Sequence, residues 1–520
     1  MADSLSRIRL IASVALLLPL FSGAPVAVGG VECTVASVQP HAPAGTTIKA
    51  AAVVAATDKL PEYCRVDATV ATPGNTVDFR LGLPVRWNGK FFFEGVGGFA
   101  GAIGSLDIGL SRGYASASTD TGHQGGGTDA SWAVNNPAKV IDYGYRGTHV
   151  TSVAAKSLTQ TFYGSASRYA IFNGCSNGGR QALMEAERFP EDFDGIIAGD
   201  PGLGTQGHLK RLLTYQTMMS SPDHVLPAAK LETISKAVLA ACDKNDGLAD
   251  GLISDPRLCH FDPGTLRCRG TDGPDCLTEG QVETVKALYA DAKTPLGTIP
   301  GFPVGHESGG TGWQAWIVGS EAPVQTGNTL AFGSRKPTGY NFQDGYFRFL
   351  AFDGADGTFD WRTFDLKRDG PKLEARSKIM SPTDHDLTKL QKRGGKLLIY
   401  HGWADPALSA YGSIAYYNDA VKAAGGHQKA DDFVRLFMVP GMHHCSGGPG
   451  PNTFDMITAL ENWLDKATPP TRIVASHATN GVVDRTRPLC PEPQVARYLG
   501  SGSIDAAENF RCEAPQGARP

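Results

Sequence analysis

The sequence predicts an α/β fold in which a mostly parallel sheet is interrupted by one large insertion. Apolar runs alternate with helix-like runs from residue 113 to 201, which is typical of strands and helices wound around a parallel sheet. From about residue 203 to 382 strand-like periodicity is weak, and aromatic residues and glycines cluster. The apolar strands then resume at residues 396–400 and 433–439. At 520 residues the chain is long for a single core, so a core with one inserted domain is the simplest organisation.

The N-terminus has the pattern of a signal peptide. Arg7 and Arg9 precede an apolar run at residues 10–21, and mainly small residues follow at 22–30. The apolar run is shorter than the ~20 residues that a membrane-spanning helix needs. We therefore expect residues 1–29 to be removed. Ten cysteines downstream agree with an oxidising compartment, and the sequence contains no N-x-S/T acceptor, so we predict a secreted or periplasmic bacterial protein.

The charge pattern excludes several classes of function. The formal net charge is −4, with acidic and basic residues interspersed, so no surface for nucleic acid or for coating a membrane is expected. Glycine and proline are abundant but not periodic, and there is no internal repeat or coiled-coil heptad. Nothing in the sequence predicts an oligomeric state.

The first part of the core is predicted to be a set of strands that ends in a glycine loop. Residues 33–93 alternate apolar and polar side chains between turn residues, as antiparallel strands do. A buried strand at 90–93 then leads into the loop 95–99. Such a loop can be an ordinary turn. In an α/β-hydrolase it supplies one backbone N–H of the oxyanion hole, here Gly98 or Gly97, and Asn177 after the nucleophile supplies the other.

Residues 173–179 have the features of a nucleophile elbow. They lie between an apolar run at 169–172 and a helix-like run at 180–188, which is the strand–turn–helix context that the motif needs. Small neighbours let the backbone turn tightly enough to present the Ser176 hydroxyl. A glycine-rich turn that contains serine is common, so the interpretation depends on partners further along the chain.

Those partners are Asp405 and His444. Both come just after predicted strand ends, and the order Ser176, Asp405, His444 is the order of an α/β-hydrolase triad. A serine hydroxyl needs a base within hydrogen-bond reach and an acid that orients the base. His443 is a competing base. We favour His444 because it is next to a cysteine.

Two cysteines flank the predicted catalytic residues. Cys175 directly precedes Ser176, and Cys445 directly follows His444. A disulfide between them would tie the nucleophile to the base, and positioning is its expected benefit. Two separate buried thiols are the alternative.

Three motifs together resemble the tannase and feruloyl esterase family, which includes bacterial mono(2-hydroxyethyl) terephthalate hydrolases. They are GCSNGG at 174–179, HGWAD at 401–405 and PGMHHC at 440–445. The resemblance covers essentially the whole chain after the signal peptide. It implies an α/β-hydrolase core formed by residues 30–202 and 383–520, and a lid formed by residues 203–382. It also implies five disulfides: Cys33–Cys64, Cys175–Cys445, Cys242–Cys259, Cys268–Cys276 and Cys490–Cys512.

A second candidate site lies in the insertion. Three aspartates fall within eight residues, from 243 to 250, and such carboxylates repel one another unless a hard cation such as Ca²⁺ binds between them. The loop is not an EF-hand, and an acidic surface turn is the alternative. By resemblance the calcium ligands would be the side chains of Asp243, Asp246 and Asp250 and the carbonyls of Leu248 and Leu252. The ion would be structural, and we expect no organic cofactor.

The resulting prediction is a serine carboxylic ester hydrolase acting on a small aromatic ester. Hydroxycinnamoyl (feruloyl) or galloyl esters are the first candidates, because an aromatic-rich lid suits a flat acid. A terephthalate half-ester is the second candidate and would need a lid cation, for which Arg335 and Arg348 are available. A calcium-stabilised binding protein without turnover is the alternative from another class. Trp313 and Phe347 represent lid aromatics that can equally form the core of the lid.

Overall fold

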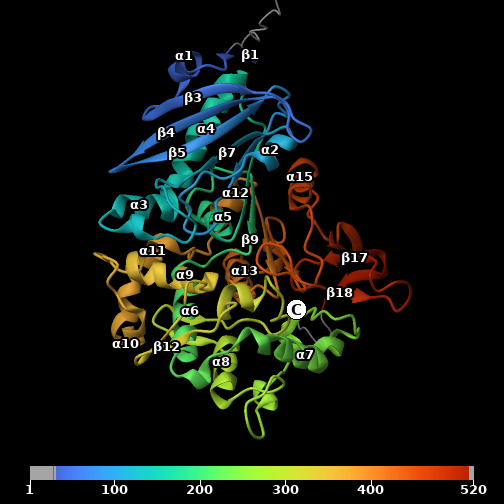
Figure 1. The fold of residues 1–520 in the computed structure, drawn as a ribbon. Helices are drawn as coiled ribbons and strands as arrows, with labels where there is room; N and C mark the ends of the chain where they lie inside the picture. The colour runs from blue at the N-terminus through green and yellow to red at the C-terminus, as the bar shows by residue number, and fades with distance from the viewer. Residues whose placement is uncertain (1–26, 29–30, 515–520) are drawn as a thin grey trace, which may run out of the picture.

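A computed structural model describes residues 27–28 and 31–514. Its centre is a nine-stranded sheet (Figure 1). Across the sheet the strands are β15 (Val434–Val439), β14 (Lys396–Gly402), β9 (Gly195–Gly199), β8 (Ala170–Cys175), β6 (Phe91–Glu94), β7 (Ala115–Thr119), β5 (Asn75–Pro84), β4 (Tyr63–Thr72) and β3 (Thr46–Val54). The six strands from β15 to β7 are parallel, and β5, β4 and β3 add an antiparallel edge. The predicted α/β class is confirmed.

The sheet is covered on both faces, which explains why its central strands are apolar throughout. In β6, Phe91 and Phe93 pack into one cluster with helices α4 (Gly147–Tyr163), α5 (Asn177–Arg188) and α13 (Ala410–Ala424). Phe92 points to the opposite face and packs with α15 (Met456–Lys466). Because successive side chains in a strand alternate between faces, a strand buried on both sides reads as a continuous hydrophobic run.

The insertion between β9 and β14 adds no strand to this sheet in the described part of the chain. It is mainly helical, and its segments, green to light orange in Figure 1, lie below the sheet. Its larger helices are α6 (Thr205–Met218), α7 (Leu231–Cys242), α8 (Glu279–Tyr289), α9 (Thr338–Gly345) and α11 (Glu374–Met380). They have a separate hydrophobic cluster, which also includes Phe99 and Tyr143 from the core. The insertion is therefore packed against the loops above it.

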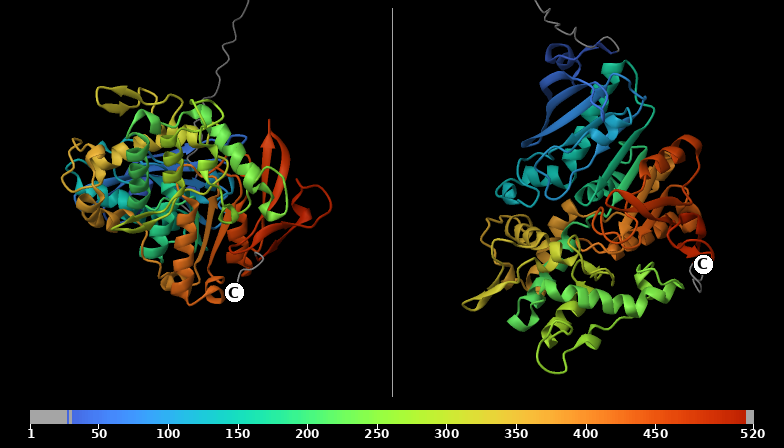
Figure 2. Two further views of the ribbon diagram at one scale, coloured as in Figure 1. Left: turned by 90° about the horizontal axis from the view of Figure 1, so that it is seen from below. Right: turned by 45° about the vertical axis from the view of Figure 1, so that its right-hand side comes forward.

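The C-terminal region contains strands that the sequence did not reveal. After the predicted helix at α15, β16 (Ile473–Thr479) pairs with β17 (Val482–Leu489), and β18 (Val495–Tyr498) pairs with β19 (Phe510–Glu513). These ribbons project to one side of the sheet (Figure 2). The predicted signal peptide, residues 1–29, lies outside the described residues except for Ala27–Val28.

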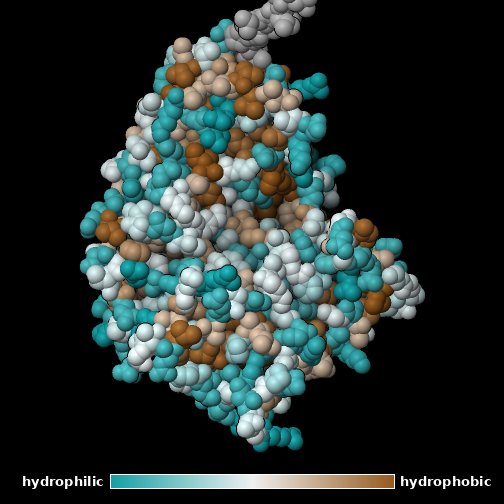
Figure 3. All heavy atoms as spheres, in the orientation of Figure 1, coloured by the Kyte–Doolittle hydropathy of each residue, from teal (hydrophilic) through white to brown (hydrophobic). Residues whose placement is uncertain are grey.

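Neither the visible surface nor the described helices show an extended hydrophobic region. Hydrophilic residues are spread over the visible face, and hydrophobic residues form small groups, several of them in a hollow near the middle (Figure 3). Among the described helices, none combines the length and the apolar character that crossing a bilayer requires.

Candidate active site

The predicted nucleophile elbow is formed by β8 and α5. Ser176 lies between them with φ 64° and ψ −122°, a conformation that L-residues rarely adopt and that is typical of a strained functional turn. Glycine is required on both sides of it. A Cβ on Gly174 would lie 2.6 Å from the backbone of Gly178, and a Cβ on Gly179 would lie 2.3 Å from the carbonyl oxygen of Gly199. The turn therefore closes because these positions lack side chains.

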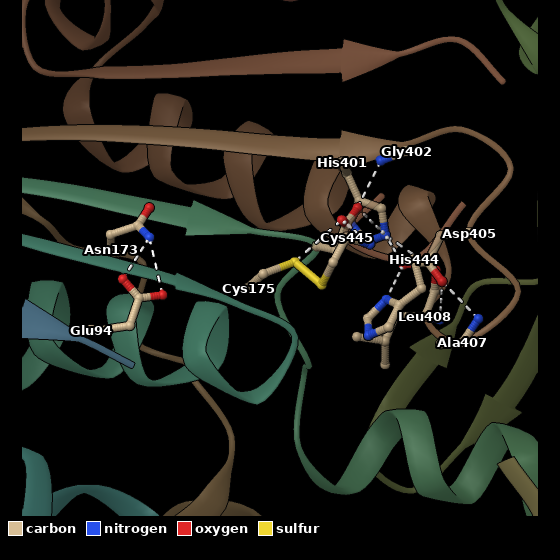
Figure 4. The surroundings of a disulfide bond; sticks show 11 residues. Glu94, Asn173, Cys175, His401, Gly402, Asp405, Ala407, Leu408, His444 and Cys445 are labelled. Atoms are coloured by element: carbon tan, nitrogen blue, oxygen red, sulfur yellow. Dashed lines mark hydrogen bonds and ion pairs between the residues drawn. A yellow bond between two sulfur atoms is a disulfide. The ribbon is translucent and has the colours of Figure 1, made fainter. Parts of the chain in front are cut away.

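The structure brings Asp405 and His444 together from the ends of β14 and β15 (Figure 4). His444 Nδ1 lies 2.7 Å from Asp405 Oδ2, and Asp405 Oδ1 accepts the N–H groups of Ala407 and Leu408 at 2.6 and 3.0 Å. Burial opposes ionisation of Asp405, but the charge of His444 and the hydrogen bond from His401 outweigh it and hold the pKa of the Asp405 carboxyl well below its usual range. Asp405 is thus an anion that fixes the imidazole of His444.

His443, the competing base, lies elsewhere. Its Nδ1 is 2.6 Å from Thr311 Oγ1, and its Nε2 is 3.3 Å from the carbonyl oxygen of His306. These partners belong to the insertion, and His443 borders a different cavity from the one that contains Ser176. Of the two histidines, His444 is therefore the one that contacts Asp405.

A disulfide joins the elbow to the base loop. Cys175 and Cys445 are bonded, with their Cα atoms 6.0 Å apart (Figure 4). Asp200, at the end of β9, supports the same junction: its Oδ2 accepts the Cys445 N–H at 2.8 Å, and its Oδ1 accepts the Gly402 N–H at 2.7 Å. The loops that carry Ser176, Asp405 and His444 are therefore held by one covalent bond and one buried carboxylate.

The other four disulfides are also those that the resemblance implies. They are Cys33–Cys64, Cys242–Cys259, Cys268–Cys276 and Cys490–Cys512. With Cys175–Cys445, all ten cysteines are bonded.

The glycine loop and Asn177 meet beside Ser176. In the described residues neither the Gly98 N–H nor the Asn177 N–H has a hydrogen-bond acceptor, and Gly98, Ser176 and Asn177 border the same cleft. The Asn177 side chain links the two segments, because its Nδ2 donates to the Val96 carbonyl oxygen at 2.8 Å. Tyr143 strengthens the link, since its hydroxyl lies 3.1 Å from both the Gly98 carbonyl oxygen and Asn177 Oδ1. Two N–H donors that are free within the described chain are thus held beside Ser176.

The cleft itself is partly open to solvent. Ser176 and His444 both border it, although within the described chain the Ser176 hydroxyl makes no hydrogen bond. Such bonds are often long or absent until substrate is bound. Trp316 and Phe342 of the insertion form an apolar wall, with parallel rings whose centroids are 6.1 Å apart. The cleft therefore offers an aromatic group a surface on which to stack beside Ser176.

The arginines and aromatic residues considered for the lid do not border this cleft. Trp313 and Phe347 are buried in the cluster of the insertion. Arg335 is exposed and paired with Glu321, and Arg348 donates to the Gly357 carbonyl oxygen at 2.8 Å. Neither arginine is a cation at the cleft. A composition rich in aromatics predicts an aromatic lid but does not indicate which helix face meets the cavity.

The acidic loop of the insertion follows α7. Asp243 Oδ1 accepts the Gly251 N–H at 3.1 Å, and Asp246 Oδ1 accepts the Leu248 N–H at 2.9 Å. The side chain of Asp250 is buried and forms an ion pair with Arg487 of β17 at 2.5 Å. Among the described residues, the carbonyl oxygens of Leu248 and Leu252 accept no hydrogen bond. The loop thus offers the oxygen donors that Ca²⁺ prefers, but its three carboxylates are not within 4.8 Å of one another.

Tyr143 and Asp200 are the supporting residues that sequence reasoning missed. Both act through segments that are distant in the chain, and neither belongs to a recognisable motif. The one available signal is that Asp200 directly follows the apolar strand β9, where parallel sheets present functional side chains.

Comparison with known proteins gives concordant matches. Residues 64–513 match the family model described as tannase and feruloyl esterase. An uncharacterized esterase of Xanthomonas campestris is 35% identical over 89% of this chain and 86% of its own length. The mono(2-hydroxyethyl) terephthalate hydrolase of Piscinibacter sakaiensis is 34% identical over 90% of this chain and 87% of its own length. Feruloyl esterase B from Aspergillus oryzae has a similar fold, with a TM-score of 0.80 and 24% identity over 91% of this chain and 97% of its own.

Proposed function

Because the chain belongs to the tannase and feruloyl esterase family and is a carboxylic ester hydrolase, we propose that it cleaves esters of aromatic acids through an acyl-enzyme on Ser176. One observation carries this proposal. The cleft that contains Ser176 also contains His444 held by Asp405, two unpaired N–H groups and an aromatic wall. These groups would supply the nucleophile, the base, the oxyanion hole and the binding surface for acyl transfer from a flat acid. Their presence together argues against a binding protein without turnover.

In the proposed reaction the same residues act first in acylation of Ser176 and then in deacylation. Ser176 Oγ attacks the ester carbonyl while His444 Nε2 takes the hydroxyl proton, and Asp405 stabilises the imidazolium that forms. The N–H groups of Gly98 and Asn177 donate to the oxyanion of the tetrahedral intermediate. His444 then returns the proton to the leaving alcohol. Water, activated by the same histidine, attacks the acyl-enzyme and releases the aromatic acid.

Hydrolysis of an ester panel with and without Ser176 tests the proposal. Purified protein is incubated with methyl ferulate, methyl gallate and mono(2-hydroxyethyl) terephthalate, in parallel with Ser176→Ala. At least one ester should turn over, and the substitution should lower that rate by ~10³-fold or more. Equal rates for the two proteins would refute Ser176 as the nucleophile. The preferred acid distinguishes hydroxycinnamoyl or galloyl esters from the second candidate, a terephthalate half-ester, which the 34% identical relative supports.

We also propose that the acidic loop binds one structural Ca²⁺ through Asp243, Asp246, Asp250 and the carbonyls of Leu248 and Leu252. The unpaired carbonyls of Leu248 and Leu252, and the presence of three carboxylates on one short loop, support this proposal. Binding would require the carboxylates to move closer together than they are in the structure. The ion would stiffen the junction between the insertion and the C-terminal ribbon, where Arg487 meets Asp250.

Removal of calcium should therefore lower the thermal stability. With EDTA we expect the unfolding midpoint to fall by several degrees, because a ligand at 100 times its Kd contributes about 2.7 kcal/mol. Ca²⁺ added in excess should restore the midpoint, and Mg²⁺ should not. Asp243→Asn should be insensitive to EDTA. An unchanged midpoint in the wild type, after dialysis against EDTA, would contradict the proposal.

Export from the cytoplasm completes the proposed function. The basic and apolar N-terminal segment and the five disulfides favour a secreted or periplasmic protein.

A further inference from the structure

Arg211 is a buried guanidinium with unused hydrogen-bonding capacity. It lies on α6, is 9% exposed and borders the cleft together with Ser176 and His444. Among the described residues it has no ion-pair partner, and its one hydrogen bond goes from Nη2 to the Ala407 carbonyl oxygen. A guanidinium has five N–H donors. Burial of a charge that has no counterion destabilises the folded protein. Its presence at the cleft therefore indicates a role in function.

Arg180 shows what a structural arginine looks like in the same cleft. It is also buried, and it donates to four acceptors: Asn177 Oδ1 at 2.7 Å and the carbonyl oxygens of Gly144 at 2.6 Å, Tyr143 at 2.9 Å and Met380 at 3.4 Å. Its donors are committed to holding the elbow and the insertion together. Of the described arginines that border the cleft, Arg211 therefore has donors to offer a ligand.

The surroundings of Arg211 favour a planar acid. Its guanidinium lies 5.9 Å from the ring centre of Phe342. Phe342 and Trp316 together form the apolar wall of the cleft. His208, three residues earlier on α6, also borders the cleft and stacks on Tyr346 at 4.2 Å. Burial, and then the positive charges of Arg211 and Arg180, lower the pKa of His208 well below its usual range. At neutral pH the pocket thus combines two guanidinium groups, of which Arg211 has donors to spare, with a neutral imidazole and aromatic faces.

Arg211 stays ionised near neutral pH although it is buried. Burial lowers the pKa of Arg211 to about 10, so the side chain remains charged near neutral pH. The acid that attracts it from inside the protein is Asp405, whose oxygens are occupied by His444 and by backbone N–H groups. Among the described residues no carboxylate forms a direct ion pair with Arg211, so an anionic ligand can pair with its free donors.

We propose that Arg211 binds a free carboxylate of the ester substrate and so selects esters that carry a negative charge. The inference rests on the proposed esterase function. The carboxylate can belong to the acyl part, as in a half-ester of an aromatic diacid, or to the alcohol part, as in an ester of a hydroxy acid. Bidentate pairing of a guanidinium with a carboxylate supplies both affinity and orientation.

Matched substrate pairs that differ only in charge test this proposal. On the acyl side, mono(2-hydroxyethyl) terephthalate is compared with the 2-hydroxyethyl ester of 4-carbamoylbenzoate. On the alcohol side, caffeoylquinate is compared with its quinate methyl ester. For at least one pair, the wild type should favour the anion in kcat/KM by about 10- to 100-fold, as expected for hydrogen bonds to a charged group. The pair that shows the preference identifies which part of the substrate carries the carboxylate.

Variants assign that preference to Arg211. In Arg211→Gln the ratio of the two kcat/KM values should collapse toward one, mainly through KM, and Arg211→Lys should retain part of it. Arg335→Gln is the matched control, because Arg335 is an exposed lid arginine outside the cleft; its ratio should equal that of the wild type. A wild-type ratio in Arg211→Gln would overturn the proposal.

A measurement on the wild type alone keeps the test independent of the folding of a variant. Terephthalate should inhibit hydrolysis of a neutral ester at a concentration at least about 10-fold lower than terephthalamide does. Equal inhibition would overturn the proposal about Arg211 while the esterase function stands. Absence of any turnover that depends on Ser176 would instead refute the proposed function, so the two failures are distinguishable.

Discussion

Exchange of His444 for glutamine is expected to lower kcat/KM by ~10⁴-fold or more, whereas the same exchange at the neighbouring His443 should cost less than about 10-fold. The reason is positional. His444 Nδ1 is 2.7 Å from Asp405 and its ring borders the cleft, while His443 is hydrogen-bonded to Thr311 and faces another cavity. Glutamine at position 444 cannot shuttle the serine proton. At position 443 it removes only contacts to the insertion.

The measurement is kcat/KM on the ester that the wild type prefers, for both variants under identical conditions. Thermal unfolding of each variant controls for His443→Gln, because that side chain is buried and its loss can affect stability without affecting chemistry. Similar losses in two equally folded variants would contradict the assignment of His444 as the base. A loss confined to His443→Gln would assign the base to His443.

The residues that act through local geometry were predictable from the sequence. Ser176 was identified because small residues, an apolar strand and a helix surround it within a dozen positions, and the backbone torsion of Ser176 matches that context. Asp405 and His444 follow strand ends, and parallel strands that start on one side of a sheet must end on the other. Chain order and topology therefore suffice to bring these three to one edge.

The residues that hold the site in place were not predictable in the same way. Tyr143 reaches Asn177 and Gly98 from the π-helical segment Asp142–Arg146, more than 30 residues before the elbow. Asp200 bridges to Cys445 across 245 positions. No short-range pattern encodes such contacts. The same holds for Arg211: a cation in a lid helix reads as an ordinary surface residue until the structure shows that it is buried at the cleft.

Loss of the Cys175–Cys445 disulfide should damage both stability and catalysis. The bond closes a sequence separation of 270, for which the chain-entropy model gives about 5.6 kcal/mol, and measured losses for native disulfides are usually about 2–5 kcal/mol. The double variant Cys175→Ala/Cys445→Ala also frees the residues next to Ser176 and His444. Small displacements of catalytic groups cost rate steeply, so we expect kcat to fall by about 10- to 100-fold even well below the unfolding temperature.

Cys268→Ala/Cys276→Ala separates the two effects of a disulfide. That pair lies in the insertion, away from the cleft, and closes a separation of only 8, so the same entropy model gives about 2.5 kcal/mol. Its removal should lower the unfolding midpoint less and leave kcat near the wild-type value. If both double variants lost stability but kept kcat, the central disulfide would be a global cross-link and not a positioning device. Asp200 would then suffice to hold the base loop, because its hydrogen bond to the backbone N–H of residue 445 does not depend on the sulfur.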